Sequence, residues 1–267
     1  MDRVRLYADG GDDADIWAGL AELGVPALLV PEAQGGIGLN PLDAAIVAES
    51  LGAHITPSPF LGTAVMAPTA LVASGGNHDD LLAEIAAGTH RVGIAFSEAI
   101  KRRNDARVEA RDSRLFGKSL FAFDADANSY LVADQNKHLY LVGAQDPGLT
   151  RTHLTTVDKT RRTVELTYDD VAAQCISTDV GVFERVLDIG RVAIAADTLG
   201  AAQNMLDQAV EYAKQREQFN RPIGSFQAVK HMCAEMAAQL EPCRSMVWFA
   251  GHALAELPEE ARVTACH

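Results

Sequence analysis

The segment from Arg216 to Gln227 gathers side chains whose types suit a phosphate-bearing ligand. Arg216 presents a fixed fork of N–H donors that matches a phosphate group. Gln218 and Gln227 add amide donors and acceptors, and Phe219 adds a flat apolar surface on which a ring can stack or pack. The same residues also fit a plain connection between two helices, in which Arg216 caps the last carbonyls of a helix and Phe219 fills a gap in the core. The residue types leave both interpretations open.

Other motifs that could carry chemistry are weak. The run Gly35-Gly36-Ile37-Gly38 follows an apolar stretch, but Pro41 stands where a dinucleotide-binding motif needs its third glycine, and no strand–helix–strand unit surrounds it. None of the eight histidines lies in a His-x-x-x-His or His-Glu pair, and the four cysteines show no Cys-x-x-Cys spacing. We therefore expect no metal site and no disulfide framework.

The composition is that of a globular protein whose surface as a whole repels anions. The chain has 267 residues, of which 48% are apolar, and its 36 acidic and 23 basic side chains give a net charge of -13. This charge argues against nucleic acid and membrane surfaces as partners. No apolar run approaches the ~20 residues of a membrane span, and the N-terminus lacks the basic-then-apolar order of a signal peptide. We expect a cytoplasmic protein.

Three regions with different periodicities follow one another along the chain. Residues 12–90 read as short helices that end at breakers such as Gly24. From Val92 the pattern changes to short period-two runs of strand formers, which predict a small antiparallel sheet. The helical period then returns, with one long helix expected to end near Phe219 and a second one whose apolar stripe begins at Phe226.

These regions predict an α+β fold with an N-terminal helical domain at residues 1–91, a β domain at 92–175 and a C-terminal long-helix bundle at 176–267. The bundle is expected to be incomplete. Leu257-Pro258-Glu259-Glu260 begins a further helix, and the sequence ends seven residues later. A helix cut off this early leaves an apolar face without partners, so either the natural chain is longer or another subunit covers that face.

The segment that begins at Arg216 also carries a family resemblance. Its residues read Arg-Glu-Gln-Phe-Asn-Arg-Pro-Ile-Gly-Ser-Phe-Gln, which closely resembles the Arg-x-Gln-Phe-Gly-x-Pro-Ile-x-x-Phe-Gln loop of acyl-CoA dehydrogenases. Further matches occur in family order at residues 17–36, 158–161 and 168–171. The resemblance thus covers the chain from about Trp17 to His267.

The resemblance implies a FAD-dependent enzyme that oxidises the Cα–Cβ bond of an acyl-CoA thioester. In the family, this loop joins two long helices, reaches across a dimer interface and contacts the pyrophosphate and adenine end of the neighbouring subunit's FAD. The residues to which it assigns cofactor binding in trans are Arg216, Gln218, Phe219, Phe226 and Gln227. Asn220 stands where the family usually has glycine, and asparagine tolerates a positive φ well enough to keep the turn.

The family's catalytic base has no counterpart that can be named in this sequence. Abstraction of the α-proton needs a carboxylate with a raised pKa and direct reach. In most of the family this glutamate lies in a C-terminal region beyond His267, and in a minority it lies on the first long C-terminal helix, where the match falls on Gly190. The next residue, Arg191, matches an arginine that the family keeps near its active site, and an ion pair on the helix surface is an equally good interpretation.

The β domain departs from the family where the family binds flavin. The Thr-Glu-Pro-x-x-Gly-Ser-Asp segment, which lines flavin and substrate, reads Ser-Glu-Ala-Ile-Lys-Arg-Arg-Asn from Ser97, so only Glu98 and a hydroxyl remain. The Lys-x-Trp-Ile-Thr-Asn strand reads Lys-Ser-Leu-Phe-Ala-Phe from Lys118. The tryptophan and threonine positions are then Leu120 and Ala122, whose side chains form no hydrogen bond with flavin N5 or O4.

The sequence therefore keeps the loop that serves a neighbour's FAD and loses much of the pocket for a FAD of its own. Family members with this asymmetry act as the smaller subunit of heteromeric dehydrogenases, either heterodimers or α2β2 heterotetramers, and some act on CoA thioesters of sterol side chains or ring fragments. Contacts with the acyl-CoA substrate are assigned to Ser97 and Arg191. Two alternatives stay open: a catalytically silent structural or acyl-CoA-binding subunit, and an oxidase or flavin monooxygenase of the same fold.

Overall fold

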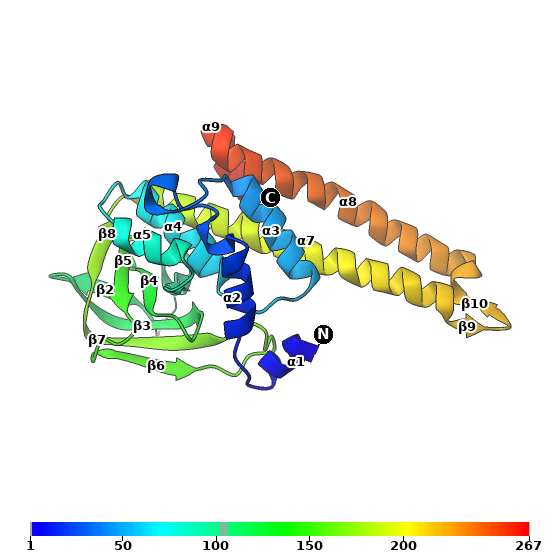
Figure 1. Cartoon of the computed structure of the whole chain (residues 1–267), viewed down its shortest axis with the longest axis horizontal. Coiled ribbons are helices and arrows are strands. Elements are labelled where there is room, and N and C mark those ends of the chain that lie inside the picture. Colours follow the sequence, from blue (N-terminus) through cyan, green and yellow to red (C-terminus); the bar gives the residue numbers. More distant parts are fainter. Residues whose placement is uncertain (1, 102, 104–105, 267) are drawn as a thin grey trace. The chain divides into compact units, whose positions relative to one another are not determined.

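A computed structural model gives the fold of residues 2–101, 103 and 106–266. Short helices, then strands, then long helices follow one another, which confirms the α+β fold class (Figure 1). Contacts between Cα atoms divide the chain into two units. The first comprises Met1–Asn40 and Pro57–Gly190, and the second comprises Pro41–Thr56 and Arg191–His267. The division into three domains at 91 and 175 stays a prediction.

The short helices of the first unit end at residues that stop helices. They are α1 (Asp2–Ala8), α2 (Ala14–Glu22), α4 (Ala67–Ala73), which continues a π-helical stretch at Phe60–Met66, α5 (Asp79–Ala86) and α6 (Ser97–Ile100). Gly24 follows α2 at a φ of 78°, a conformation that glycine adopts at low cost. Trp17 anchors α2, because its ring is buried and its Nε1 donates to Gly88 O at 2.8 Å.

Within the described residues, eight strands of the first unit form one sheet. They are β1 (Val92–Ala95), β2 (Val108–Arg111), β3 (Arg114–Phe123), β4 (Ser129–Ala133), β5 (Leu139–Gly143), β6 (Leu149–His153), β7 (Thr163–Ala172) and β8 (Gln174–Ser177). Their order is β6-β7-β3-β1-β4-β5-β8, with β2 paired to β3. The sheet is mixed rather than wholly antiparallel as expected. The β2–β3 hairpin lies between β1 and β4 in the sequence, and the chain re-enters β4 parallel to β1.

Some elements depart from the sequence pattern because tertiary contacts override it. β2 reads Val-Glu-Ala-Arg and β6 reads Leu-Thr-Arg-Thr-His, which are polar sequences, and each becomes a strand by pairing with a longer neighbour, β3 or β7. The long helix α7 (Val180–Gln215) ends four residues before Phe219, where its end was expected. The chain leaves the helix early to enter a short hairpin.

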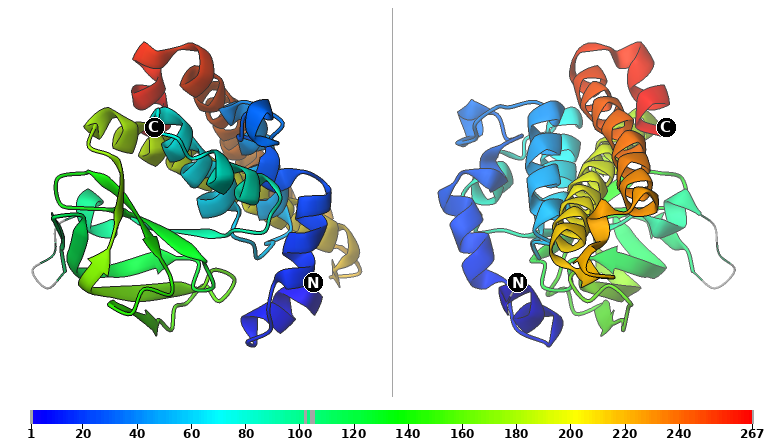
Figure 2. Two further views of the ribbon diagram at one scale, coloured as in Figure 1. Left: turned by 60° about the vertical axis from the view of Figure 1, so that its left-hand side comes forward. Right: turned by 90° about the vertical axis from the view of Figure 1, so that its right-hand side faces the viewer.

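Two apolar clusters stabilise the first unit. The strands of the sheet curve (Figure 2). One cluster is formed by buried side chains of these strands, such as Leu115 and Tyr130. The other lies between the sheet and the helices α4, α5 and the first turns of α7, and includes Leu71 and Phe183. Each such apolar side chain contributes about 1.5–3 kcal/mol by its burial.

The second unit is built from α3 (Pro41–Ala53), the rest of α7, α8 (Gln227–Glu256) and α9 (Pro258–Cys266). α8 runs back alongside α7, and the two are joined by the hairpin of β9 (Glu217–Gln218) and β10 (Arg221–Pro222) (Figure 1). α3 begins at Pro41, which suits the first helical position because that position needs no N–H donor. Among the described residues, no helix is apolar over a length that could span a bilayer.

Helices α3, α7 and α8 meet around Glu49. A Cβ added at Gly200 of α7 would lie 1.8 Å from Glu49 O, so only glycine lets the two backbones approach this closely. Arg244 of α8 donates to Glu49 Oε1 and to Gln203 Oε1, each at 2.9 Å, and Trp248 Nε1 donates to Glu49 Oε2 at 3.1 Å. The Glu49 carboxylate therefore connects α3 to α8, and Arg244 extends the network to Gln203 of α7.

Gly200→Ala should destabilise the second unit, because the added methyl group would force the α3 and α7 backbones apart. We expect a loss of about 1–3 kcal/mol, which is typical of overpacking, measured as a lower thermal midpoint. Gly19→Ala is the control, since a Cβ at Gly19 meets nothing within 4 Å and alanine favours the helix more than glycine does. Equal midpoints for the Gly200 variant and the parent chain would contradict this packing.

Asp124 is a half-buried residue in the turn after β3. Its φ is 65°, and its Oδ1 accepts the Asp126 N–H at 3.2 Å. Its Oδ2 is buried and has no hydrogen-bond partner among the described residues. Burial raises the pKa of Asp124 from 3.8 to about 6, although the nearby Arg91 guanidinium opposes the rise. Asp13 and Asp126 raise the pKa further, but Arg91 is itself paired with Asp13 at 2.8 Å.

The raised pKa of Asp124 predicts how stability depends on pH. The folded state favours the protonated form of Asp124. The contribution of Asp124 to the free energy of unfolding is therefore complete below the ordinary pKa of 3.8, and it is lost as the pH rises through about 6. Asp124→Asn, which stays neutral, should be more stable than the parent chain by about 1–2 kcal/mol at about pH 8 and should have no advantage at about pH 4. Thermal denaturation at both pH values checks this. A variant that is less stable than the parent at the higher pH would show that Asp124 is not strained by its charge.

Candidate functional site

The hairpin between α7 and α8 has a tight two-residue turn. Residues 217–218 pair with 221–222, and Ile223 N donates to Arg216 O at 2.8 Å. The turn residues Phe219 and Asn220 have φ values of 54° and 58°. Two successive positive φ values are the mark of a type I′ turn, which suits the twist of a hairpin. The expectation that Asn220 keeps the positive φ of the family's glycine is confirmed.

The side chains of this hairpin point outward rather than into the helices. Arg216, Gln218 and Gln227 are exposed, and the Phe219 ring is 84% exposed. Phe219 therefore does not fill a gap in the core of this chain. The Arg216 guanidinium has no hydrogen-bond or ion-pair partner in the part of the chain that the structure describes, so it does not cap helix carbonyls there either. The structure therefore does not support the purely structural interpretation of these two side chains.

Three side chains of the hairpin stack on one another. The Arg221 guanidinium lies 4.0 Å from the centroid of the Phe226 ring. The rings of Phe219 and Phe226 have centroids 6.1 Å apart and an interplanar angle of 83°, which is an edge-to-face contact. Sequence reasoning did not single out Arg221, because nothing in its spacing shows that it would stack on a ring five positions later.

In the first unit, Ser97 and Glu98 begin α6 and belong to an internal network. The Glu98 side chain is only 2% exposed. Its Oε2 accepts the Ser97 hydroxyl at 2.6 Å, and its Oε1 accepts the backbone N–H of Leu120 at 3.0 Å. Arg103 Nη1 lies 3.5 Å from the same Oε1. The hydroxyl expected to contact substrate is thus hydrogen bonded to its neighbour.

The outward face of β3 carries two aromatic rings. Phe121 is 46% exposed and Phe123 is 36% exposed, whereas Ala122 is fully buried in the sheet interior. The Arg103 guanidinium lies 5.4 Å from the centroid of the Phe121 ring. The sequence match had placed the family's tryptophan and threonine at Leu120 and Ala122. That correspondence stays a prediction. An irregularity in pairing with β7 between Ser119 and Ala122 shifts the strand register, and Ala122 then lies in the sheet interior. The exposed phenylalanines also offer no hydrogen bond to a flavin.

Gly190 of α7 is buried against a methionine. A Cβ added at this position would lie 2.9 Å from Met66 Sδ and 3.1 Å from its Cε. The space where a minority of the family carries its glutamate is therefore occupied by a neighbouring side chain. A carboxylate introduced at Gly190 would have to displace Met66 before it reached any substrate.

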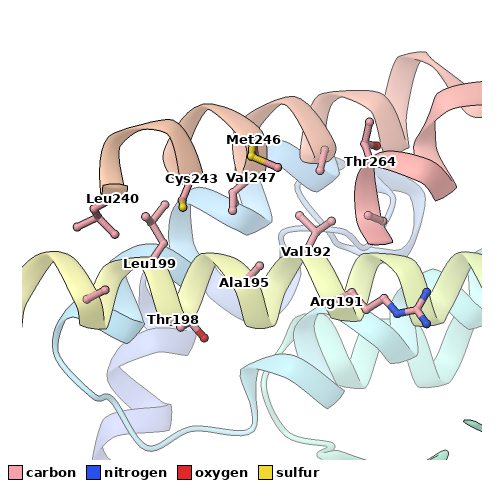
Figure 3. A pocket seen from close by; sticks show the side chains of 13 residues that line it. Arg191, Val192, Ala195, Thr198, Leu199, Leu240, Cys243, Met246, Val247 and Thr264 are labelled. Carbon is pink, nitrogen blue, oxygen red and sulfur yellow. The ribbon is translucent and has the colours of Figure 1, made fainter. Parts of the chain in front are cut away.

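Arg191 lies at one end of an apolar groove in the second unit. The groove has a volume of about 350 Å³ and is lined mainly by side chains of α7 and α8. Figure 3 shows Leu240, Cys243, Met246 and Val247 of α8 facing Leu199, Ala195 and Val192 of α7. Arg191 Nη1 contacts Cys266 Sγ at 3.3 Å. Two large apolar side chains of α8 are exposed to solvent, Met246 to 50% and Phe249 to 45%.

Among the described residues, no group of three or more His, Cys, Asp or Glu side chains is arranged to hold a metal ion.

Comparison with known families matches both helical parts of the chain. The acyl-CoA dehydrogenase N-terminal domain matches residues 2–89, and the acyl-CoA dehydrogenase C-terminal domain matches residues 180–266. The chain belongs to the acyl-CoA dehydrogenase family, which confirms the resemblance drawn from the loop at Arg216.

Two similar proteins are acyl-CoA dehydrogenases named IpdE2. The one from Mycobacterium tuberculosis is 33% identical over 252 residues, which cover 94% of this chain and 69% of that protein. The one from Mycolicibacterium smegmatis is 30% identical over 246 residues, which cover 92% of this chain and 68% of that protein. This chain therefore spans about two thirds of the length of either relative.

Solved structures of two assemblies have the same fold. A variant of the Tcur3481–Tcur3483 steroid ACAD superimposes with a TM-score of 0.87 at 28% identity, covering 99% of this chain and 76% of that one. A chain of the ChsE4–ChsE5 complex from Mycobacterium tuberculosis superimposes with a TM-score of 0.82 at 25% identity, covering 95% of this chain and 72% of that one. Each of these names joins two proteins.

Glu98→Ala should destabilise the first unit, because the backbone N–H of Leu120 and the Ser97 hydroxyl would lose their acceptor inside the protein. We expect a loss of about 1–3 kcal/mol, measured by chemical denaturation. Glu98→Gln keeps an amide oxygen for the Leu120 N–H and should lose less. If both variants unfold at the same denaturant concentration as the parent chain, Glu98 is not a structural acceptor and its role in the site has to be reconsidered.

Proposed function

We propose that this chain is a subunit of a FAD-dependent acyl-CoA dehydrogenase and that its α7–α8 hairpin contacts, in trans, the FAD of a partner subunit. The observation that carries the proposal is the exposed hairpin itself. Among the described residues Arg216 has no hydrogen-bond or ion-pair partner, Phe219 is 84% exposed, and the outward face of β3 carries the apolar rings of Phe121 and Phe123. Residues 216–227 keep the family's loop in every position but the glycine.

The local charge of the hairpin supports an anionic ligand. From Glu211, which pairs with Lys214, to Lys230 the sequence has four basic side chains and two acidic ones, an excess of two positive charges on a chain whose net charge is -13. Such a concentration of one sign attracts an anion from a distance and is screened by salt. The pull on a diphosphate would therefore be confined to this part of the molecule.

The donor set of the hairpin fits the adenosine diphosphate part of FAD. Arg216 would hold the diphosphate with paired N–H donors, and each charge-assisted bond of this kind is worth about 1.5–3 kcal/mol. Gln218 and Gln227 would provide amide contacts, and Phe219 would pack against the adenine or ribose. When bound, FAD supplies the hydride acceptor for oxidation of the substrate's Cα–Cβ bond. The Phe226 ring packs against the Phe219 ring in an edge-to-face contact.

The residues of this chain's own flavin-facing strand do not fit a second FAD. Phe121 and Phe123 are apolar, the Ser97 hydroxyl is bonded to Glu98, and Met66 fills the space beside Gly190. We infer that the base which removes the α-proton comes from the partner subunit or from a segment outside residues 1–267. Ser97 and Arg191 are proposed as contacts with the acyl-CoA. The Ser97 hydroxyl donates to Glu98, but its oxygen can still accept a hydrogen bond from the substrate. Arg191 is suited to an anionic group of the ligand.

The partner is proposed to be a larger acyl-CoA dehydrogenase subunit in a heterodimer or an α2β2 heterotetramer. The similarity to the Tcur3481–Tcur3483 steroid ACAD and to the ChsE4–ChsE5 complex supports a pair of unlike subunits. The steroid named in the first of these supports a CoA thioester derived from a sterol as the substrate. We expect a cytoplasmic enzyme with no direct contact to nucleic acid or membrane.

A second candidate function is a catalytically silent structural or acyl-CoA-binding subunit. The packing of Met66 against Gly190 favours it, because no carboxylate of this chain is then available at the reacting carbon. General acid–base catalysis contributes about 10²–10⁴ to a rate, so a chain without a base depends on its partner for most of the chemistry. The two functions differ in whether the hairpin affects the partner's flavin.

Arg216→Ala in the co-purified complex should weaken FAD binding about 10- to 100-fold, because one or two charge-assisted bonds to the diphosphate are lost. The measurement is flavin absorbance per mole of complex after gel filtration. Arg5→Ala is the control, since Arg5 is an exposed arginine of α1 in the other unit. Retention of full flavin by the Arg216 variant would contradict the contact in trans and would favour the silent subunit.

A further inference from the structure

We propose that Arg221 is a positioning residue for the hairpin: by stacking on Phe226 it holds the Phe219–Asn220 turn in the conformation that presents Phe219 and Arg216. The inference deepens the proposed function and rests on it for the identity of the ligand. The stacking itself is a property of this chain alone. Two contacts support the proposal. The Arg221 guanidinium lies over the face of the Phe226 ring, and the Phe219 ring makes an edge-to-face contact with that same ring.

The turn needs support because its first residue is unsuited to it. Type I′ turns favour asparagine, aspartate and glycine at both central positions. Asn220 meets this preference at a φ of 58°, but Phe219 adopts a φ of 54°, which is rare for a bulky side chain. Burial does not compensate the strain, since the Phe219 ring is 84% exposed in this chain. A strained, exposed residue persists only when its surroundings fix it.

The backbone of the hairpin gives little of that support. β9 and β10 pair over two residues each, and one of those residues is Pro222, which has no N–H to donate. Arg221 pairs directly with Gln218, the residue before the turn. Residues opposite each other in an antiparallel pair place their side chains on the same face. Arg221 is thus the side chain best placed to join the hairpin to the start of α8.

Phe226 contacts both Arg221 and Phe219. It lies immediately before α8, at the N-cap position, so the helix fixes its backbone. One face of its ring carries the Arg221 guanidinium at 4.0 Å, and the edge-to-face contact with Phe219 has a centroid separation of 6.1 Å. The ring of Phe226 therefore acts as a support, and Phe219 is the ring left for a ligand. This reassigns Phe226 from a cofactor contact to a positioning role.

Arginine suits this role better than lysine. Its planar guanidinium stacks on a ring while its N–H donors stay in the plane, whereas a lysine ammonium is a compact charge on a flexible stem. Arg221→Lys should therefore keep only part of the effect, and Arg221→Gln should lose it. Phe226→Leu should resemble Arg221→Gln, because it removes the ring on which both neighbours pack.

The first experiment uses the chain alone and measures amide hydrogen exchange by NMR. The Ile223 amide, which donates to Arg216 O, reports on hairpin closure. We expect its exchange to accelerate about fivefold or more in Arg221→Gln and in Phe226→Leu, and less in Arg221→Lys. Arg5→Gln should leave it unchanged. Unaltered exchange in Arg221→Gln would overturn the positioning role whatever the ligand is.

The second experiment measures FAD content of the complex and separates positioning from direct contact. Arg221→Gln should lower flavin content, and adding Asn220→Gly should restore much of it, because glycine at the second turn position favours the type I′ conformation without a guanidinium. If the double variant recovers hairpin closure but not flavin content, Arg221 binds the ligand directly and the proposal is wrong. If Arg221→Gln alone loses hairpin closure but keeps its full flavin content, the proposal is also wrong. If Arg216→Ala leaves flavin content unchanged, the proposed function fails, while the exchange result for Arg221 stands by itself.

Discussion

A guanidinium without a partner and an aromatic ring held at a positive φ are features from which an isolated chain in water gains no stability. Within the part of the chain that the structure describes, Arg216 and Phe219 are both of this kind, and they lie within four residues of each other at the end of a helical hairpin. Strain of this sort is characteristic of sites that bind something. The Glu49 network and the glycine contact at Gly200 fix the helices that carry the hairpin.

In the first unit, by contrast, the groups that could face a cofactor are apolar or make hydrogen bonds within the unit. Glu98 is surrounded by Ser97, Arg103 and the backbone of β3, and Met66 closes the space beside Gly190. These contacts make a well-packed domain rather than an open pocket. A chain with such a domain and such a hairpin is consistent with a protein that completes another subunit's site.

Local features of the fold were predictable from the sequence. Gly24 after α2 and the positive φ of Asn220 depend on the residue itself, and the period of the long helices depends on neighbours a few positions away. The strand register was not predictable. Ala122 is buried because of an irregularity in the pairing of β3 with β7, and β2 and β6 are strands because longer strands lie beside them. Likewise, the loop at Arg216 could be identified from its residues, but the stacking of Arg221 on Phe226 is visible only in three dimensions.

The central claim is that the FAD contacted by this hairpin belongs to a different subunit. The ratio of flavin to protein in the purified complex of this chain and its partner tests that claim most directly. The account predicts one FAD for each pair of unlike subunits, and none retained by this chain when it is purified alone. A full equivalent of FAD bound to this chain without a partner would contradict it.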